Sequence, residues 1–350
     1  FQAEDGIRDR SPSRGLGDVY KRQIQSPGYG RIVAAQLPPR QEGEVLVRTL
    51  FTGISRGTES MVYRGEVPES QRELMRAPFQ EGDFPGPVKY GYSSVGIVAD
   101  GPNTLTDTLV FCLYPHQDRY CVPATEVVPL PSGVPAERAV LGANAETALN
   151  AVWDIEHYTS ESMIVIGAGV VGLLTGWLYA RTRGVQPLIY DTDPHRAKVA
   201  AALGLRFTEI LPAEKVDLVI HASGQPEGLR QALSIAERDA TILELSWYGD
   251  QQITLPLGEA FHSHRLTIKS SQVGSIPPHR RSEWTHRARL EAALDLLVDP
   301  SLDVLISGES SFDDLPKVME RLSRRPGGTL CHRIRYPTPK TPLRREVRHV

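Results

Sequence analysis

The chain has 350 residues, of which 40% are hydrophobic and 23% charged, and its formal net charge at pH 7 is −3. This length allows two domains with a large core, and the charge lacks the basic surplus typical of nucleic-acid binding. No apolar run reaches the ~18 residues needed to span a membrane, and three cysteines without a Cys-x-x-Cys pair cannot form a disulfide framework. We therefore expect a soluble protein of the cytoplasm.

The first 23 residues are polar, mixed in charge and without apolar periodicity. They lack the apolar stretch of a signal peptide. They resemble the translated adapter sequence found at the ends of some metagenomic assemblies, and the alternative is a native disordered tail. We expect neither structure nor function in this segment.

The next region predicts a series of short strands. Apolar or alternating runs that favour strands occupy residues 31–34, 44–50, 87–98, 109–114 and 119–123. Between them, residues 52–59 read as a loop that delivers side chains to a site, or as a plain connector. Residues 63–85 form a charged excursion that is either a substrate rim or a solvated insertion. The region predicts a small β barrel or sandwich, which ends in a Pro/Gly linker at residues 129–135.

A predicted helix over residues 136–153 leads into the most informative stretch of the chain. Residues 163–166 form a short apolar run that is typical of a buried parallel strand. A glycine-rich turn follows at once and precedes apolar residues at helical spacing; it consists of Gly167, Ala168, Gly169, Val170, Val171 and Gly172. A strand, a Gly-x-Gly-x-x-Gly turn and a helix in this order predict a site for a dinucleotide pyrophosphate.

The second strand of this unit suggests which dinucleotide binds. Asp191 ends an apolar run and follows Gly172 by 19 residues. A carboxylate at this spacing binds the ribose 2′-hydroxyl of NAD and repels the 2′-phosphate of NADP. Arg196 offers the opposite preference or flanks the adenosine, so NAD is the first choice and NADP the alternative.

The α/β alternation continues to about residue 274. A helix is expected at residues 196–203, and the strand that begins at residue 217 runs into a polar turn of Ala222, Ser223 and Gly224, which should lie along the dinucleotide. Further strands at residues 240–245 and 266–270, with a helix at 228–236 before them, complete a doubly wound parallel sheet. After a helix at 289–297, strands are expected at residues 302–306 and 330–335, and residues 337–350 are expected to be disordered.

These features together resemble the medium-chain dehydrogenase/reductase superfamily, the zinc alcohol dehydrogenase and quinone reductase type. The similarity rests on Gly53-Ile54-Ser55, the strand at residues 95–98, Thr147-Ala148-Leu149, the glycine turn and Ala202-Leu203-Gly204. It implies a GroES-like catalytic domain at residues 24–150, completed by residues 275–336, around a Rossmann domain at residues 151–274. It also implies a homodimer that pairs the last Rossmann strand, residues 266–270, across two copies.

The departures from the superfamily concern its catalytic zinc. The positions of the three zinc ligands hold Ser55 (or Arg56, with a different gap), Tyr92 and Ala143. A zinc site needs Cys, His or Asp/Glu ligands, so no metal is expected there. Cys112, His116 and Cys121 do not have a common zinc spacing either. The loops around Ser55 and Tyr92 look most like a zinc-less branch that includes the bacteriochlorophyllide dehydrogenases.

Without a metal, side chains must stabilise the substrate oxygen and move a proton. Tyr92 is the first candidate, because a phenol both donates a hydrogen bond and can act as an acid; the alternative is a core or rim tyrosine. Ser55 and Thr58 are candidate proton relays, or satisfy loop backbone. The candidate bases are Glu59 and Glu146, and the favoured alternative for Glu146 is an ordinary helix-surface residue. His116 is a candidate acid/base or substrate ligand.

The sequence thus predicts a zinc-independent, NAD-linked oxidoreductase of a secondary alcohol or carbonyl compound. Within enzymes, the alternative is reduction of a C=C bond in a quinone or enone. From another class, the alternative is a dinucleotide-binding module without chemistry. The loops at Trp247-Tyr248 and at residues 272–274 are expected to border the nicotinamide or to pack as ordinary loops.

Overall fold

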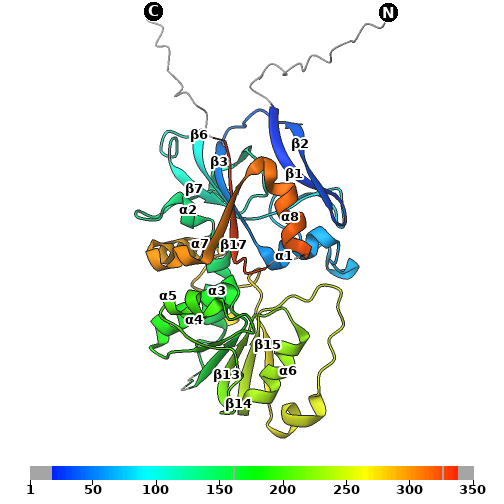
Figure 1. The fold of residues 1–350 in the computed structure, drawn as a ribbon. Helices are drawn as coiled ribbons and strands as arrows, with labels where there is room; N and C mark the ends of the chain where they lie inside the picture. The colour runs from blue at the N-terminus through cyan, green and yellow to red at the C-terminus, as the bar shows by residue number, and fades with distance from the viewer. Residues whose placement is uncertain (1–17, 159, 161, 325–326, 338–350) are drawn as a thin grey trace, which may run out of the picture.

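The computed structural model describes residues 18–158, 160, 162–324 and 327–337. The chain forms a β-rich half, drawn in blue, cyan and red, and an α/β half in green and yellow (Figure 1). The expected fold class, a Rossmann sheet with a β-rich second domain, is confirmed. No helix in the described ranges is long and apolar enough to cross a bilayer.

The β-rich half is built around β3 (Glu44–Ile54), whose residues alternate between half-buried and buried from Glu44 to Leu50. The strand pairs with three antiparallel neighbours, β6 (Ser94–Asp100), β8 (Arg119–Pro123) and β17 (Cys331–Arg335). The full sheet also contains β16 (Ile306–Ser311), β7 (Leu109–Cys112) and β9 (Val128–Pro129). A second, four-stranded sheet consists of β2 (Tyr29–Gln36), β1 (Asp18–Ser26), β5 (Val88–Lys89) and β4 (Glu81–Gly82).

The expectation that the first 23 residues lack structure is wrong for residues 18–23. They belong to β1, which pairs with β2 from Asp18↔Gln36 onward, and Val19 and Ile24 are buried. The two strands form a tight hairpin that closes at Ser26↔Tyr29. Periodicity gave no signal because a buried arginine, Arg22, interrupts the apolar positions of the strand. Arg22 is also fully buried there, and its guanidinium has no hydrogen-bond partner among the described residues. Residues 1–17 and the tail 338–350 lie outside the described residues.

Two further predictions are corrected. Residues 52–59 are not a loop, because β3 continues to Ile54 and helix α1 (Arg56–Arg64) begins directly after Ser55. Residues 302–305 are not a strand but part of a 3-10 helix (Pro300–Leu305), and β16 begins at Ile306. In both places a short run with few apolar residues fits the repeat of a helix as well as that of a strand, so tertiary packing determines which one forms. The other helices around this half are α2 (Ala136–Ala139), α7 (His286–Asp295) and α8 (Leu315–Arg324).

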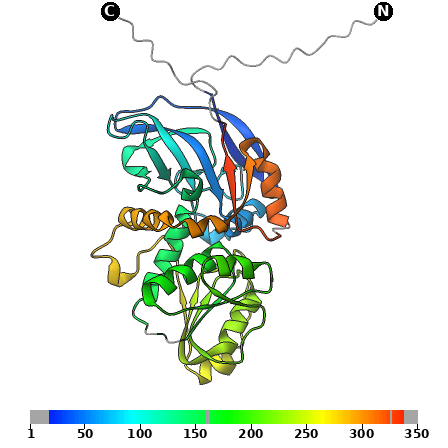
Figure 2. The same ribbon diagram turned by 60° about the vertical axis from the view of Figure 1, so that its left-hand side comes forward.

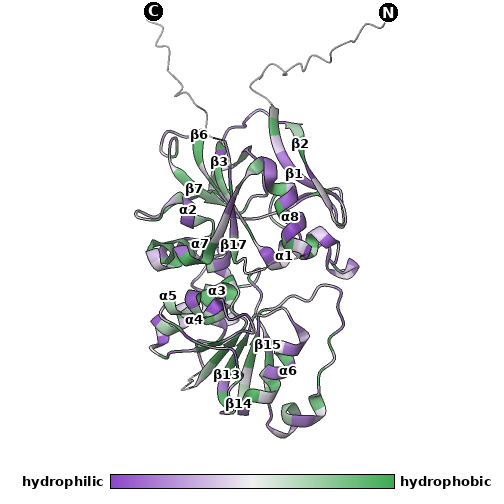
Figure 3. Ribbon diagram, in the orientation of Figure 1, coloured by the Kyte–Doolittle hydropathy of each residue, from purple (hydrophilic) through white to green (hydrophobic). Residues whose placement is uncertain are grey.

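The α/β half contains six parallel strands with helices on both faces. Their order is β12 (Arg206–Thr208), β11 (Leu188–Tyr190), β10 (Met163–Ile166), β13 (Val216–His221), β14 (Ala236–Glu244) and β15 (Thr267–Ser270). The helices are α3 (Gly142–Asp154), α4 (Val170–Arg183), α5 (Arg196–Ala202) and α6 (Pro226–Ile235). Hydrophobic residues dominate these strands (Figure 3), because both faces are covered.

The alternation along β10 shows how the two faces are packed. Met163 and Val165 belong to the core shared with α3 and α4, whereas Ile164 and Ile166 pack with the α6 side. The strand order reverses between β10 and β13, and ligands of such sheets bind at the carboxyl ends beside this reversal. In the chain, that edge faces the β-rich half, and α7 lies between the two halves (Figure 2).

Candidate active site

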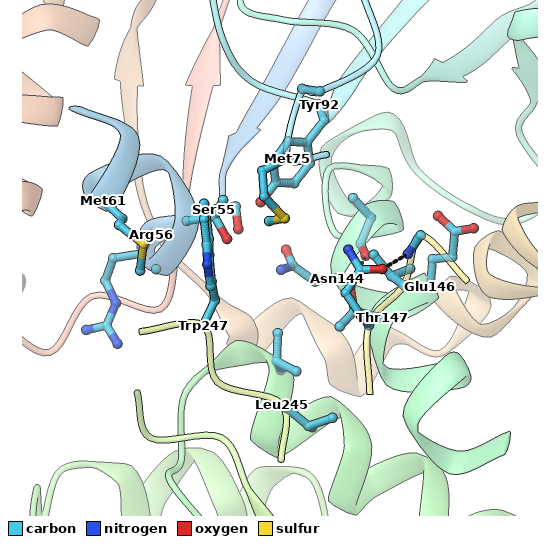
Figure 4. A pocket seen from close by; sticks show the side chains of 18 of the residues that line it. Ser55, Arg56, Met61, Met75, Tyr92, Asn144, Glu146, Thr147, Leu245 and Trp247 are labelled. Atoms are coloured by element: carbon cyan, nitrogen blue, oxygen red, sulfur yellow. Dashed lines mark hydrogen bonds between the residues drawn. The ribbon is translucent and has the colours of Figure 1, made fainter. Parts of the chain in front are cut away.

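A cavity of about 1000 Å³ lies between the two halves. Its walls come from α1 and the segment around Met75 on one side and from the first turns of α3 on the other (Figure 4). The glycine turn and the loops that follow β13, β14 and β15 form its floor. A cavity of this size is sufficient for a cofactor and a small molecule together.

The glycine turn has the geometry that a pyrophosphate requires. Gly167 has a φ of +108°, and a Cβ there would lie 2.6 Å from the Ser223 nitrogen. A Cβ on Gly172 would lie 2.0 Å from the Gly167 carbonyl oxygen, so this glycine is needed for close packing. By contrast, no atom lies within 4 Å of a Cβ on Gly169, which leaves open space at the start of α4. The free N–H groups of Val170 and Val171 there suit a phosphate.

Asp191 lies beside this turn, as the spacing predicts. Its carboxylate accepts hydrogen bonds from the Ala168 N–H at 2.7 Å and the Asp193 N–H at 2.9 Å. Arg196 is buried and donates to the Gly328 carbonyl at 3.0 Å. Arg56 of α1 approaches from the other half. Burial and the positive charge of Arg196 lower the pKa of Arg56, while Asp191 opposes this effect. Arg196 Nε also lies 3.3 Å from Asp193 Oδ2, so two guanidinium groups and two carboxylates lie near this corner.

A buried polar network supports the floor and was missed by sequence reasoning. His221 is fully buried, and its Nδ1 lies 2.7 Å from Glu244 Oε2 while its Nε2 lies 2.6 Å from Ser223 Oγ. Tyr248 donates to Glu244 Oε2 at 3.0 Å. The network thus ties together the two loops that follow β13 and β14, which contain Ala222 to Gly224 and Trp247. The available signal was a histidine and a glutamate that end adjacent apolar strands, in register as His221↔Glu244.

The β-rich wall carries a cluster of hydroxyl groups. Tyr92, Ser55 and Thr58 all line the cavity, and Tyr92 extends toward Ser55 in Figure 4. Burial raises the pKa of Tyr92 to about 12, and the negative charge of Glu59 adds to this rise. The nearby Ser55 and Thr58 hydroxyls partly offset the effect. Tyr92 is therefore a phenol that stays protonated at any physiological pH.

Glu59 and His116 form a second layer behind this cluster. Their side chains are 1% exposed and pair at 2.9 Å, from Glu59 Oε2 to His116 Nε2. Glu59 Oε1 accepts the Ser55 N–H at 2.9 Å, and His116 Nδ1 lies 2.7 Å from the Thr52 hydroxyl. Neither Glu59 nor His116 is among the residues that line the cavity. The pair holds the Ser55 turn in place and does not face the space where a substrate would lie.

Glu146 lines the cavity but is already engaged. It accepts a hydrogen bond from Arg289 Nε of α7 at 3.0 Å, and both side chains are almost fully buried. Arg289 also donates to Asn150 Oδ1 at 2.6 Å and to the Val273 carbonyl. Burial raises the pKa of Glu146, and Arg289 opposes the rise. The arrangement joins α3, α7 and the loop after β15, and leaves Glu146 without the freedom of a general base.

The residues at the expected zinc position do not fit a zinc ion. Ser55, Tyr92 and Ala143 all line the cavity, but a tetrahedral zinc requires three ligands of Cys, His or Asp/Glu type. Among the described residues, the one group of such side chains close enough to share a metal is Glu156, His157 and His279. That group lies elsewhere, with the latter two exposed, and Arg280 already donates to Glu156.

Comparison with known proteins gives related sequences and folds, although no family model matches the chain. An L-threonine 3-dehydrogenase of Rhizobium johnstonii is 29% identical over 120 residues, so the chain spans about a third of that relative's length, 33% of each protein. The 2-desacetyl-2-hydroxyethyl bacteriochlorophyllide A dehydrogenase of Rhodobacter capsulatus is 24% identical over 238 residues, 63% of this chain and 69% of that protein.

Among solved structures, an alcohol dehydrogenase (RspB) of Escherichia coli CFT073 complexed with NADH superposes with a TM-score of 0.71. The superposition covers 91% of this chain and 99% of that one at 16% identity. At this identity the likeness shows a shared fold.

Proposed function

We propose that this chain, which belongs to the medium-chain dehydrogenase/reductase superfamily, is a zinc-independent, NAD(P)-dependent oxidoreductase of a secondary alcohol or carbonyl compound. One observation carries the proposal: the protonated Tyr92 phenol, which lines the cavity together with Ser55 and Thr58, borders the same cavity as the glycine turn. A hydrogen-bond donor and a dinucleotide cradle in one cavity are what hydride transfer to a carbonyl requires.

The residues of the floor fit a nicotinamide dinucleotide. The open space at Gly169 and the free N–H groups of α4 receive the pyrophosphate, and Asp191 and Arg196 receive the adenosine end. The loop from Ala222 to Gly224, which lines the same cavity, would hold the dinucleotide from the side of β13. When bound, the cofactor supplies or accepts the hydride, and the protein contributes orientation and electrostatics.

Tyr92 performs the role that zinc has in related enzymes. As a carbonyl is reduced, negative charge develops on its oxygen, and a phenol with a raised pKa stabilises that charge by donating a hydrogen bond. One well-placed donor is worth about 3 kcal/mol of transition-state stabilisation. The nearby Ser55 and Thr58 hydroxyls then relay a proton from solvent to the phenolate. Glu59 and His116 act indirectly, by holding the Ser55 turn.

Replacing Tyr92 with Phe tests this role. We expect Tyr92→Phe to lower kcat about 100-fold with NADH affinity unchanged, while Tyr29→Phe on the surface behaves as wild type. Carbonyl reduction at the wild-type rate in Tyr92→Phe would exclude the phenol. Metal analysis of the purified protein provides a second check, and one tightly bound zinc per chain that is required for turnover would contradict the zinc-independent proposal.

For the cofactor we propose NAD, with NADP as the second candidate. Asp191 at the turn favours NAD, whereas Arg56 and Arg196 beside it favour a 2′-phosphate. Kinetics with both cofactors separate the two: Asp191→Ala should shift preference toward NADPH. If Arg56→Ala and Arg196→Ala each abolish NADPH-dependent turnover and spare the NADH rate, NADP is the natural cofactor instead.

Reduction of a C=C bond in a quinone or enone is the second candidate reaction. The apolar walls that carry Met61, Met75 and Trp247 (Figure 4) suit such a conjugated compound, and Tyr92 would protonate the enolate oxygen. Product analysis with an enone distinguishes an allylic alcohol, the product of carbonyl reduction, from a saturated ketone, the product of C=C reduction.

A dinucleotide-binding module without catalysis is the alternative from another class. Cofactor binding without turnover of alcohols, ketones, quinones or enones would favour it.

We also propose that the protein is a homodimer. β15 (Thr267–Ser270) is the last strand of the parallel sheet, and its outer edge has no strand partner within the described residues. Pairing of two such edges would continue the sheet across the dimer.

We propose the cytoplasm as the compartment of this protein. The three cysteines of the chain are free, which fits a reducing environment.

A further inference from the structure

The cavity has a second polar group opposite the hydroxyl cluster. Asn144 lies in the first turn of α3 (Gly142–Asp154), on the opposite wall from Ser55 and Tyr92. Its side chain is half-buried and its amide points into the space below Tyr92 and Ser55 (Figure 4). The two walls thus direct polar groups toward one region of the cavity, whose lining also includes Met61, Met75 and Trp247.

The bonding of the neighbouring polar side chains makes Asn144 distinctive. On the same helix, Glu146 is bound by Arg289, and Thr147 donates to the Ala143 carbonyl at 2.9 Å. Asn150, six residues on, is also satisfied: its Nδ2 lies 3.2 Å from Asp154 Oδ2, and its Oδ1 accepts from Arg289. For the Asn144 amide, no hydrogen bond is found among the described residues. An amide left free at a cavity wall is available to a ligand.

We propose that Asn144 is a second hydrogen-bond donor to the substrate oxygen, opposite Tyr92. The inference rests on the proposed function. A carbonyl oxygen has two lone pairs, and donors from the two walls, the Tyr92 hydroxyl and Asn144 Nδ2, occupy both. The hydride adds to the carbonyl carbon, the C=O π electrons move to the oxygen, and the proton comes from the Tyr92 side. Asn144 keeps both amide protons and stabilises the charge without titrating.

This assignment has a consequence for substrate choice. Two donors on one oxygen fix the direction of the C=O bond, and with it the face of the carbonyl that is presented to the floor. The site therefore selects ketones and secondary alcohols of one configuration. A compound without an oxygen at the reacting carbon would leave both donors unpaired, which is costly in a dry site.

The test compares Asn144→Ala and Asn144→Asp with Asn103→Ala, a matched change at an exposed loop position. Acetophenone and 4-phenyl-2-butanone serve as carbonyl substrates with NADH. We expect both Asn144 variants to lower kcat about 100-fold with the NADH dissociation constant unchanged, and Asn103→Ala to match wild type. Asp has the shape of Asn without the donor, so wild-type turnover in Asn144→Asp would overturn the proposal.

A binding measurement makes the test independent of turnover. Benzamide carries an unreactive carbonyl, and its binding to the NADH complex is followed by NADH fluorescence. We expect Asn144→Ala to weaken benzamide about tenfold, the loss of one hydrogen bond. Equal benzamide affinity in wild type and Asn144→Ala, or no benzamide binding to the wild-type NADH complex, overturns the role of Asn144. Failure of wild type to bind NADH at all would instead overturn the proposed function.

Discussion

Removing the carboxylate of Glu146 should destabilise the protein severely. In Glu146→Leu, Arg289 remains buried with a 2% exposed side chain and keeps only its bonds to Asn150 and the Val273 carbonyl. Breaking one partner of a buried ion pair costs about 3–5 kcal/mol. We expect about 3 kcal/mol, because part of the guanidinium stays bonded, and a fall in Tm of about 4 °C for a chain of this length.

Urea unfolding followed by tryptophan fluorescence measures this loss directly. Trp153 lies in α3, which carries Glu146, and Trp284 precedes α7, which carries Arg289; their rings are 4.7 Å apart. The double variant Glu146→Leu/Arg289→Met removes both charges and should recover stability to within about 1 kcal/mol of wild type. A loss below about 1 kcal/mol in Glu146→Leu alone would refute the reasoning.

The same site offers a kinetic check of the role of Glu146. Glu146→Gln keeps an acceptor for Arg289 Nε and loses only the titratable carboxylate. We expect its kcat to stay within about threefold of wild type, whereas loss of a true general base costs about 100-fold or more. A large fall in kcat with unchanged stability would show that Glu146 acts as a general base.

Three further outcomes follow from the structure. Gly172→Ala should fail to fold or bind cofactor, because its Cβ would lie 2.0 Å from the Gly167 oxygen, whereas Gly169→Ala should fold normally and lose only NADH affinity; circular dichroism and NADH fluorescence separate the two. Stability should fall as the pH rises from 10 to 12, because burial raises the pKa of Tyr92 to about 12 in the folded state above its unfolded value of about 10; urea titrations that show no loss over this range would contradict the burial of the phenol. Arg22→Met should raise the free energy of unfolding by about 1–4 kcal/mol, since the buried guanidinium lacks hydrogen-bond partners among the described residues; a lower midpoint would show that Arg22 stabilises the fold.

The parts of the fold that could be predicted are those with local chemical signatures. The strand, glycine turn and helix around Gly167 are specified within a short window, as is Asp191 at the end of the next strand. β1 was not predicted, because the buried Arg22 interrupts the apolar positions of the strand. Helix α1 was missed since its start at Ser55 follows a strand without a break.

The site shows the same division between local and distant information. The substitutions at Ser55, Tyr92 and Ala143 were visible once a resemblance supplied the positions. The ion pair that engages Glu146 was not visible in the sequence, because its partner Arg289 is 143 residues away. Asn144 gave no signal at all, since only the orientation of α3 across the cavity distinguishes its side chain from any other polar residue on a helix.

The pairing of β17 with β3 sets the order in which the protein can mature during synthesis. His332 lies opposite Ile54 in that ladder, and the Tyr336 hydroxyl is 3.4 Å from Thr52 Oγ1, beside the His116 pair. The α/β half is complete in the nascent chain long before residue 331 leaves the ribosome, whereas the sheet that positions Ser55 must wait for it. The growing polypeptide therefore forms its dinucleotide-binding half first, and the wall that carries Ser55, Thr58 and Tyr92 last.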